Sequence, residues 1–517
     1  MNAAQVLIRT LVGCGVDTCF MNPGTSEINF VAALDVIPEM HGVLCLFEGV
    51  ATGAADGHAR MTSKAASTLL HLGPGLGNGL ANLHNARRAR SPIVNLVGDH
   101  ATYHKLHDTL LESDIDTVAR NVSRWVRRSA QPDEVGRDVA EAVAAATAPP
   151  AGIATLIVPA DVAWLEGGEP AAPPLEPQLA PVSDDVIEKT ASALRSGKPC
   201  VVLLGGRSLR EPGLVTASRV ASATGAELLC ETFPARLERG RGLPAIERLA
   251  YLAESASAQL AGVRHLVTVD ARVPVSFFAY PGKPSSLVPD GCETHVLASG
   301  ADDAVEALGN LADLIGAPRS VPGERLKRPE RPKGELTSET AALGVGALLP
   351  EGAIVSDEAN TMVRWMSAAT AGAARHDWLT LTGGAIGDGL PVATGASIAC
   401  PDRKVVCLEA DGSAMYTFQA LWTQARESLD VTTVLLNNRS YAILNLELRR
   451  LGAGPPGPKG LGMLDLSRPD LDFVSLARGM GVQASRAETA EEFTIQLENA
   501  LAEPGPHLIE AMVRGRP

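Results

Sequence analysis

The stretch Leu408-Glu409-Ala410-Asp411-Gly412-Ser413 and, further along, Leu435-Leu436-Asn437-Asn438 decide the fold that we predict for this chain. The apolar run 405–408 is typical of a buried parallel strand, and Asp-Gly-Ser stands at its C-terminal end. Residues 415–427 follow an unbroken helical pattern, and 431–436 form a second strand that ends in Asn-Asn. The sequence therefore predicts a strand–turn–helix–strand unit, with a carboxylate at one strand end and a carboxamide at the next.

These two strand ends suit a metal-bridged phosphate. Neighbouring parallel strands end side by side, so Asp411 and Asn438 can converge on one hard cation. Mg²⁺ takes oxygen ligands in an octahedron, often one or two carboxylates together with ligand phosphates. Ser413 and the backbone N–H groups at the helix start can hold phosphate oxygens. An isolated Asp-Gly pair usually marks only a turn, but here the spacing, the helix and both strand ends agree, so we expect a bound diphosphate with its metal.

Length and composition set wider limits. A chain of 517 residues is expected to hold two to four domains. Its net charge of −14 argues against nucleic acid and anionic membranes as partners. No apolar run reaches the ~18 residues that span a bilayer, and the chain begins with an amphipathic helix instead of a signal peptide. The eight cysteines show no Cys-x-x-Cys spacing and are typical of a reducing compartment. We therefore expect a cytoplasmic protein.

Two proline-punctuated segments divide the chain into three units. Residues 1–166 alternate strands and helices and end before the linker 167–181. A second α/β unit covers 183–318, and after a charged linker the third unit, 336–517, holds the opening motif. The alternation predicts an α/β fold with three doubly wound parallel-sheet domains. In the first unit we expect a strand over 42–47 closed by Glu48 and a glycine-rich loop over 71–79. In the third, 452–460 is expected to form a mobile lid.

Glu48 is a candidate for acid–base work. It stands between an apolar strand and a helix of small residues, where a carboxylate should be desolvated and able to hold or share a proton near neutrality. The alternative is a carboxylate that stabilises a helix N-terminus through the helix dipole.

Together these features resemble the thiamin diphosphate-dependent enzymes. The stretch from Asp411 to Asn438 resembles their Gly-Asp-Gly…Asn-Asn motif, with Ala410 as a departure. Residues 47–60 resemble their segment His-Glu-x-x-Ala-x-x-x-Ala-x-Gly-Tyr-Ala-Arg, with Phe47 and His58 as departures. The resemblance covers nearly the whole chain, and it implies the order pyrimidine-binding, central and diphosphate-binding domain. It also implies that Glu48 bonds the pyrimidine N1′ and so promotes loss of the thiazolium C2 proton.

The resemblance assigns further residues to the cofactor and its metal. Asp411 and Asn438 would bind Mg²⁺ together with the backbone carbonyl of Ser440. Ile386 would be the bulky residue that props the cofactor in its bent shape. The remaining contacts to the cofactor are implied for Asn360, Gly412, Ser413, Ala414 and Tyr441.

Two branches of the family compete. Gly73-Pro-Gly75 resembles the acetolactate synthases, whereas Asn22-Pro-Gly, Ala420-Leu-Trp422-Thr and His71 resemble the benzoylformate decarboxylases. In the second branch the positions of Thr25 and His71 face the substrate. His71 can alternatively be a hydrogen-bonded core histidine.

Proton supply distinguishes the two reactions. The second active-site histidine of the decarboxylase branch would fall near 277–280, where this sequence has none. A site short of proton donors favours attack on a second carbonyl, so we expect a 2-oxo acid decarboxylase and carboligase that uses an aldehyde or a second 2-oxo acid as acceptor. The alternatives are a benzoylformate decarboxylase-like, non-oxidative 2-oxo acid decarboxylase and a thiamin diphosphate-binding protein without catalysis. FAD is not expected, because the short central unit carries no flavin signature.

Assembly follows from the same resemblance. Glu48 lies in the first unit and Asp411 in the third, and in the family these two units come from different subunits. We therefore expect a homodimer or homotetramer with shared active sites.

Overall fold

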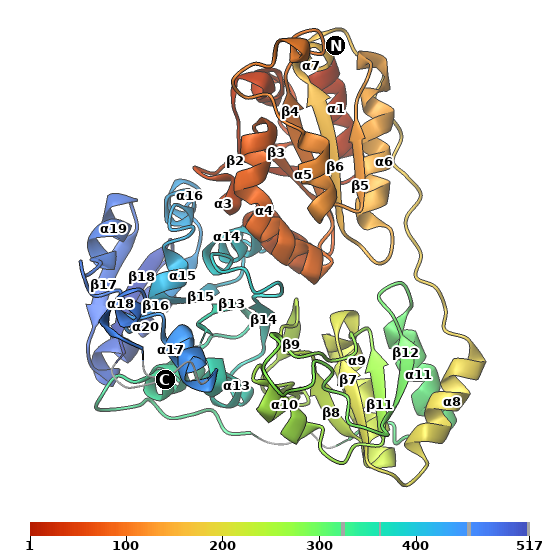
Figure 1. Ribbon diagram of the computed structural model, residues 1–517, viewed down its shortest axis with the longest axis vertical. Helices are drawn as coiled ribbons and strands as arrows, with labels where there is room; N and C mark the ends of the chain where they lie inside the picture. Colours follow the sequence, from red (N-terminus) through yellow and green to blue (C-terminus); the bar gives the residue numbers. More distant parts are fainter. Residues whose placement is uncertain (322–325, 361–362, 452–455, 514–517) are drawn as a thin grey trace.

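The computed structural model describes residues 1–321, 326–360, 363–451 and 456–513. Its three sheets lie in three lobes, which we name the N-terminal lobe (residues 1–166), the central lobe (183–318) and the C-terminal lobe (336–513) (Figure 1). Two of the sheets are wholly parallel and the third nearly so, which confirms the predicted α/β fold class.

The N-terminal lobe contains a six-stranded parallel sheet in the order β2-β1-β3-β4-β6-β5. Its strands are β1 (Thr18–Asn22), β2 (His41–Leu44), β3 (Ala66–Leu70), β4 (Ile93–Asp99), β5 (Trp125–Arg128) and β6 (Ile153–Pro159). Its helices are α1 (Ala3–Gly13), α2 (Ile28–Leu34), α3 (Glu48–Thr62), α4 (Leu72–Ala89), α5 (Ile115–Val122), α6 (Val135–Thr147) and α7 (Ala160–Trp164).

The central lobe contains a five-stranded parallel sheet in the order β10-β8-β7-β11-β12. Its strands are β7 (Cys200–Leu204), β8 (Glu227–Cys230), β10 (Glu247–Arg248), β11 (His265–Val269) and β12 (Glu293–Ala298). Its helices are α8 (Asp184–Leu194), α9 (Glu211–Thr224), α10 (Ala253–Gln259) and α11 (Ala304–Ile315).

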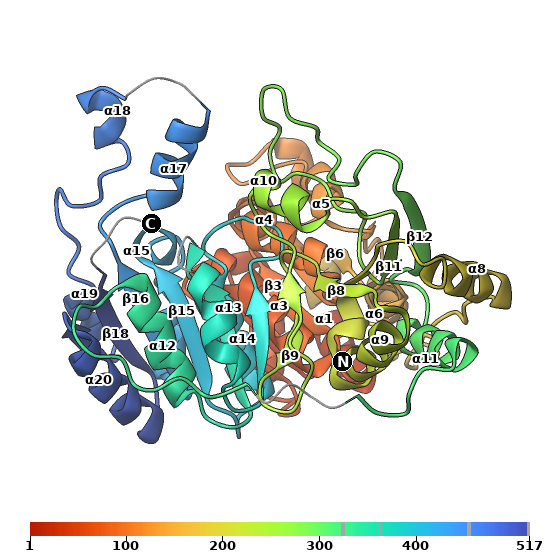
Figure 2. The same ribbon diagram turned by 90° about the horizontal axis from the view of Figure 1, so that it is seen from below.

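The C-terminal lobe contains a seven-stranded sheet in the order β17-β18-β16-β15-β13-β14-β9 (Figure 2). Six of its strands are parallel: β13 (Ala353–Glu358), β14 (His376–Thr380), β15 (Val405–Ala410), β16 (Val431–Asn437), β17 (Gln483–Ala487) and β18 (His507–Met512). The seventh, β9 (Leu237–Arg239), comes from the central stretch of sequence and pairs antiparallel with β14. The helices are α12 (Ser338–Leu348), α13 (Val363–Ala371), α14 (Gly389–Ala399), α15 (Asp411–Ala414), α16 (Ala420–Arg426), α17 (Ala442–Arg450), α18 (Pro458–Gly462), α19 (Phe473–Gly479) and α20 (Ala490–Ala502).

Three local predictions were wrong. The strand expected up to Phe47 ends at Leu44, and Glu48 is the first residue of α3. The loop expected over 71–79 is the first half of α4, because this helix packs along α3 in spite of its glycines. The single helix expected over 415–427 is shortened to α16, and residues 415–419 form turns that join it to α15. Within these turns Thr417 Oγ1 donates to the Gly387 carbonyl oxygen at 3.0 Å.

The N-terminal and C-terminal lobes meet where α3 packs on α14. Small residues allow this close approach: a Cβ at Gly57 would lie 2.1 Å from the Val392 carbonyl oxygen, and one at Gly395 would lie 1.8 Å from that of Ala54. Buried residues of both helices belong to one continuous apolar core. The start of each helix is therefore held in a fixed position relative to the other.

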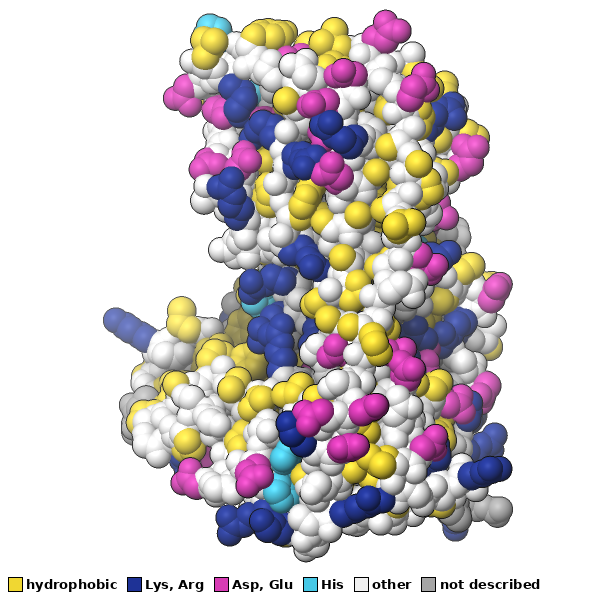
Figure 3. Space-filling model, turned by 90° about the vertical axis from the view of Figure 1, so that its right-hand side faces the viewer, with side chains coloured by type: hydrophobic (Ala, Val, Ile, Leu, Met, Phe, Trp, Pro, Cys, Tyr) yellow, Lys and Arg dark blue, Asp and Glu magenta, His cyan; other side chains and the backbone are white. Residues whose placement is uncertain are grey.

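The surface is mixed in charge. Acidic and basic side chains are interspersed on the face in Figure 3, and Lys and Arg side chains gather at the waist below the N-terminal lobe. None of the helices that the structure describes combines the length and apolar character needed to cross a bilayer.

Candidate active site

The proposed metal ligands lie together where β15 and β16 end. Asp411 Oδ2 accepts the backbone N–H groups of Asn438, at 3.1 Å, and Arg439, at 2.6 Å. Asn438 Oδ1 accepts the Ser440 N–H at 2.9 Å. Arg439 adopts a left-handed conformation (φ 57°), which turns the chain sharply after the strand. One tight turn therefore brings all three residues into contact.

The chemistry of this donor set fits a bound cation. The Asp411 carboxylate is 3% exposed. Burial raises its pKa, and the groups that oppose this among the described residues are backbone N–H donors instead of a Lys or Arg side chain. A buried carboxylate without a cationic side chain, next to a carboxamide oxygen, is the kind of oxygen-rich site that Mg²⁺ occupies.

The turn Gly412-Ser413-Ala414 is buried beneath two other predicted cofactor residues. Tyr441 packs on Gly412, where a Cβ would lie 2.5 Å from its ring. Ser413 Oγ donates to Glu409 Oε2 at 3.1 Å and accepts Asn360 Nδ2 at 3.3 Å. The serine hydroxyl is thus engaged within the protein, so backbone N–H groups are the donors left for a phosphate.

A pair of buried glutamates lies behind this turn, and the sequence reasoning gave neither a role. Glu358 ends β13, and its carboxylate accepts the backbone N–H groups of Gly387, Asp388 and Gly389 at 2.6–2.8 Å. Burial raises its pKa to about 7. Burial and the neighbouring Glu358 raise the pKa of Glu409 well above its ordinary value. Two adjacent carboxyl groups this deep in the protein hold a proton near neutral pH.

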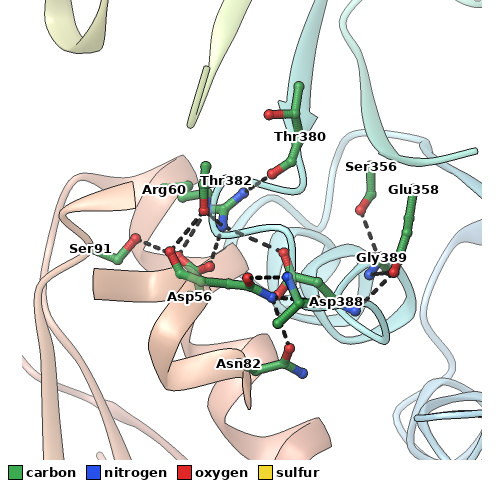
Figure 4. A network of polar contacts seen from close by, with 12 residues as sticks. Asp56, Arg60, Asn82, Ser91, Ser356, Glu358, Thr380, Thr382, Asp388 and Gly389 are labelled. Carbon is green, nitrogen blue, oxygen red and sulfur yellow. Dashed lines mark hydrogen bonds and ion pairs between the residues drawn. The ribbon is translucent and has the colours of Figure 1, made fainter. Parts of the chain in front are cut away.

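The loop before α14 is held from both lobes. Figure 4 shows that the Glu358 carboxylate accepts hydrogen bonds from the C-terminal end of this loop, and that Arg60 of α3 points towards the loop from the other lobe. Arg60 pairs with Asp56 and lies 3.6 Å from Asp388, and it donates to the Thr380 carbonyl oxygen at 2.7 Å. Ile386, the predicted prop, is half-buried in this loop. The contacts fix its backbone, as a residue that shapes a cofactor requires.

Glu48 lies at the N-terminus of α3, against the start of α4. It is 5% exposed, and its Oε2 accepts Asn78 Nδ2 at 3.0 Å. A Cβ at Gly75 would lie 3.1 Å from its Oε1. Asn82, one turn beyond Asn78, donates to the carbonyl oxygens of both Gly49 and Gly387, at 2.8 and 3.0 Å. Within one chain, therefore, the start of α3 lies beside the loop that carries Ile386.

His71 has a buried carboxylate as its hydrogen-bonding partner, which was not predicted from the sequence. Its Nδ1 lies 2.7 Å from the buried carboxylate of Glu27. Glu27 also accepts the Ser26 hydroxyl at 2.7 Å and the Gly24 N–H at 2.8 Å. The hydroxyl that lies within hydrogen-bond distance of the imidazole is that of Ser26, at 3.4 Å from Nδ1. Thr25, the residue predicted to face the substrate, is exposed. No local sequence pattern links Glu27 to His71, because the two residues are 44 positions apart.

An aromatic group occupies the region, near 277–280, where the decarboxylase branch would have its second active-site histidine. Phe277 packs on Gly384, which lies two residues before Ile386. A Cβ at Gly384 would lie 2.5 Å from the Phe277 ring. Its ring also contacts Tyr251, with centroids 5.2 Å apart, and Phe278, at 4.9 Å. The group packed on Gly384 is therefore aromatic, whereas at Gly383, one residue earlier, His84 Nε2 lies 3.2 Å from the carbonyl oxygen. Of the predicted lid over 452–460, residues 452–455 lie outside the described part of the chain.

Comparison with known proteins agrees with this geometry. Residues 1–119 match the family "Thiamine pyrophosphate enzyme, N-terminal TPP binding domain", and 359–511 match the corresponding C-terminal TPP binding domain. The chain is 61% identical over 515 residues to a Mycobacterium tuberculosis protein named "Putative acetolactate synthase large subunit IlvX", with 99% of each chain covered. It is 28% identical to the benzoylformate decarboxylase of Pseudomonas aeruginosa, with 96% of each covered. The solved structure of a thiamine diphosphate-dependent 4-hydroxybenzoylformate decarboxylase from Rhodococcus jostii RHA1 superposes with a TM-score of 0.87, at 26% identity and with 99% of each chain covered. The chain belongs to the thiamine pyrophosphate enzymes, whose cofactor is thiamin diphosphate, and it has their three-domain fold.

Proposed function

We propose that this enzyme, with thiamin diphosphate and Mg²⁺, decarboxylates a 2-oxo acid and joins the remaining acyl unit to a second carbonyl compound. Bound thiamin diphosphate supplies a site that stabilises the negative charge left when CO₂ departs. Asp411, Asn438 and the Ser440 carbonyl would hold the metal. The turn of Gly412, Ser413 and Ala414 would hold the diphosphate, with Asn360 and Tyr441 around it. Ile386 would shape the cofactor, and Glu48 would hold the proton at its pyrimidine ring.

The observation that carries the choice of carboligation is the phenyl ring of Phe277 on Gly384, in the region where the decarboxylase branch would have its second histidine. The carbon that has lost CO₂ takes either a proton or an electrophilic carbon. Phe277 can give no proton, and the Nδ1 of His71 is committed to Glu27. Without a proton from Phe277 or from the Nδ1 of His71, a second carbonyl competes better for that carbon. The counter-candidate, a benzoylformate decarboxylase-like reaction, is favoured by His71 itself, which can still offer its Nε2.

A product assay tests this. We expect purified enzyme with Mg²⁺ and thiamin diphosphate to convert 2-oxo acids to 2-hydroxy ketones, or to 2-hydroxy-2-acyl acids, whenever an aldehyde or a second 2-oxo acid is supplied. Phe277→His should shift the product towards the simple aldehyde, because an imidazole there can protonate the acyl carbon. Phe278→His, on the adjacent and more exposed ring, is the matched control. Aldehyde as the main product of the wild type at every acceptor concentration would support the decarboxylase alternative.

The side chain of Asp270 lies at the edge of the central lobe where FAD would be expected to bind. In open α/β sheets, ligands bind at the carboxyl ends of the strands. There the carboxylate of Asp270, which follows β11, accepts the Arg207 N–H at 2.9 Å and pairs with Arg90. A Cβ at Gly206 would lie 2.0 Å from the same carboxylate. Because a side chain of the protein fills this position, we propose an enzyme without FAD.

Shared active sites remain a prediction that subunit mixing can test. We expect Glu48→Gln and Asp411→Ala chains, each inactive alone, to regain activity when mixed, because a hybrid dimer would contain one site with both residues intact. Subunit exchange is verified by mass spectrometry of the mixed species. Since one chain already places the start of α3 beside the Ile386 loop, sites completed within a single chain are the competing arrangement. Subunit exchange without any recovery of turnover would show that each site is completed within a single chain.

A further inference from the structure

Three side chains of the central lobe converge far from the proposed active site. His265 is the first residue of β11, Glu293 is the first residue of β12, and the two are paired in register. His295 lies two residues further along β12, so it points to the same side of the sheet as Glu293. We propose that His265, Glu293 and His295 form a binding site for Zn²⁺, or for a similar borderline divalent cation.

The distances between the three ligand atoms fit a zinc ion. His265 Nδ1 lies 3.1 Å from His295 Nε2, and Glu293 Oε2 lies 3.7 Å and 4.0 Å from these nitrogens. A point equidistant from all three atoms in their plane is about 2.1 Å from each, which is the length of Zn–N and Zn–O bonds in proteins. A small shift of the exposed Glu293 side chain towards the imidazoles would let a cation at this point leave the plane and take a fourth, tetrahedral ligand.

Hydrogen bonding alone does not account for the arrangement. One N–H···N bond can join the two imidazoles, but the Glu293 oxygen is beyond hydrogen-bond distance of both nitrogens. The space between this carboxylate and the two imidazoles can instead be filled by a cation that contacts all three.

The residue types indicate which cation. Two imidazoles and one carboxylate suit Zn²⁺, whereas Mg²⁺ prefers oxygen ligands only. Free imidazoles are largely neutral at pH 7 and can offer a lone pair. The Glu293 side chain is 69% exposed, so the fourth coordination position opens to solvent and can take a water molecule. This set of ligands separates the site chemically from the oxygen-rich site at Asp411.

The position of the site indicates its role. It lies at the N-terminal ends of β11 and β12, the edge opposite the one where open α/β sheets bind substrates. β12 is an edge strand, joined to β11 by the long connection 270–292. A metal bridging the two strands closes this connection and fastens the edge of the sheet. We expect it to contribute to stability and not to the chemistry at the thiamin site.

Zinc binding to the full-length enzyme tests the proposal. In isothermal titration calorimetry with Mg²⁺ in excess, we expect the wild type to bind one equivalent of Zn²⁺ that also raises its melting temperature. His295→Ala should weaken this binding by at least about 100-fold, because second-shell changes alone cost 10–100-fold. Glu293→Gln, which keeps the shape but loses the charge, should weaken it by at least about 10-fold. Both side chains reach the surface, so both variants are expected to fold, as circular dichroism will verify.

The controls exclude other zinc-binding groups. A second group of imidazoles consists of His100, His104 and His107, with successive ring centroids 5.7 Å apart. Because we assign the zinc ion to the His265 site, His104→Ala should leave the zinc titration unchanged. Cys292→Ser, next to Glu293, should likewise leave it unchanged. Co²⁺ bound at the site should give the strong visible absorption of a four- or five-coordinate ion, and His295→Ala should abolish it. Wild-type affinity in both His295→Ala and Glu293→Gln, or loss of the equivalent in His104→Ala, would overturn the assignment.

Discussion

Replacing Glu48 with glutamine is expected to lower turnover by about 10²- to 10⁴-fold, the usual contribution of a positioned acid or base. The fold should survive, because the glutamine carbonyl can still accept the hydrogen bond that Asn78 donates to Glu48 at 3.0 Å. Cofactor affinity should also change little, since the residues proposed to hold the metal and the diphosphate lie at the ends of β15 and β16. What glutamine cannot do is exchange a proton with the pyrimidine ring.

Two measurements on this variant separate a chemical role from a structural one. Exchange of the cofactor C2 proton with deuterium, followed by NMR, should slow together with turnover, while calorimetry should show cofactor binding near the wild-type value. Glu39→Gln, an exposed carboxylate of the same lobe, serves as the matched control and should behave as the wild type. Wild-type C2 exchange in Glu48→Gln would show that the assignment of Glu48 is wrong.

Contiguous motifs were the part of the site that could be predicted from the sequence. Asp411 and Asn438 were placed correctly relative to one another because two neighbouring parallel strands must end at the same edge. The carboxylate partners across the fold could not be predicted in this way. Glu358 and Glu409 meet only because β13 and β15 are adjacent, and the order of strands in a sheet is a tertiary property. The same holds for Glu27 and His71, which are 44 residues apart.

The wrong prediction of a loop over 71–79 has a physical cause. Glycine disfavours helices by roughly 1 kcal/mol per residue relative to alanine, which made 71–79 look like a loop. In the structure these glycines allow α4 to lie against α3: a Cβ at Gly79 would be 2.8 Å from Thr52 Cγ2. Packing gained across the helix pair outweighs the local propensity. The pairing of β9 with β14 in the C-terminal sheet also depends on tertiary contacts, and the local sequence of residues 237–239 does not predict it.

Replacing Asp411 is expected to uncouple cofactor binding from Mg²⁺. Its carboxylate is buried, its main partners are backbone N–H groups, and it faces the turn that carries Asn438 and Ser440. Without the negative charge of Asp411, the site should lose its metal. The affinity for thiamin diphosphate should then fall by at least about 100-fold, because residues that only support a metal ligand already contribute 10- to 100-fold to metal affinity.

Asp411→Asn is the informative variant, because its carboxamide oxygen can still accept the N–H groups of Asn438 and Arg439, and only the hydrogen bond from the Gly412 N–H is lost. Calorimetric titration of wild type with thiamin diphosphate should show tight binding in Mg²⁺ and weak binding after chelation. Asp411→Asn should bind weakly under both conditions. Asp470→Ala is the matched control: it breaks the half-exposed ion pair with Arg439 on the same turn, where such pairs contribute only ~0–1 kcal/mol, and it should keep the response to Mg²⁺. If Asp411→Asn bound the cofactor as tightly as wild type, and still only with Mg²⁺, the metal would have to lie elsewhere, and the strand-end site would lose its proposed role.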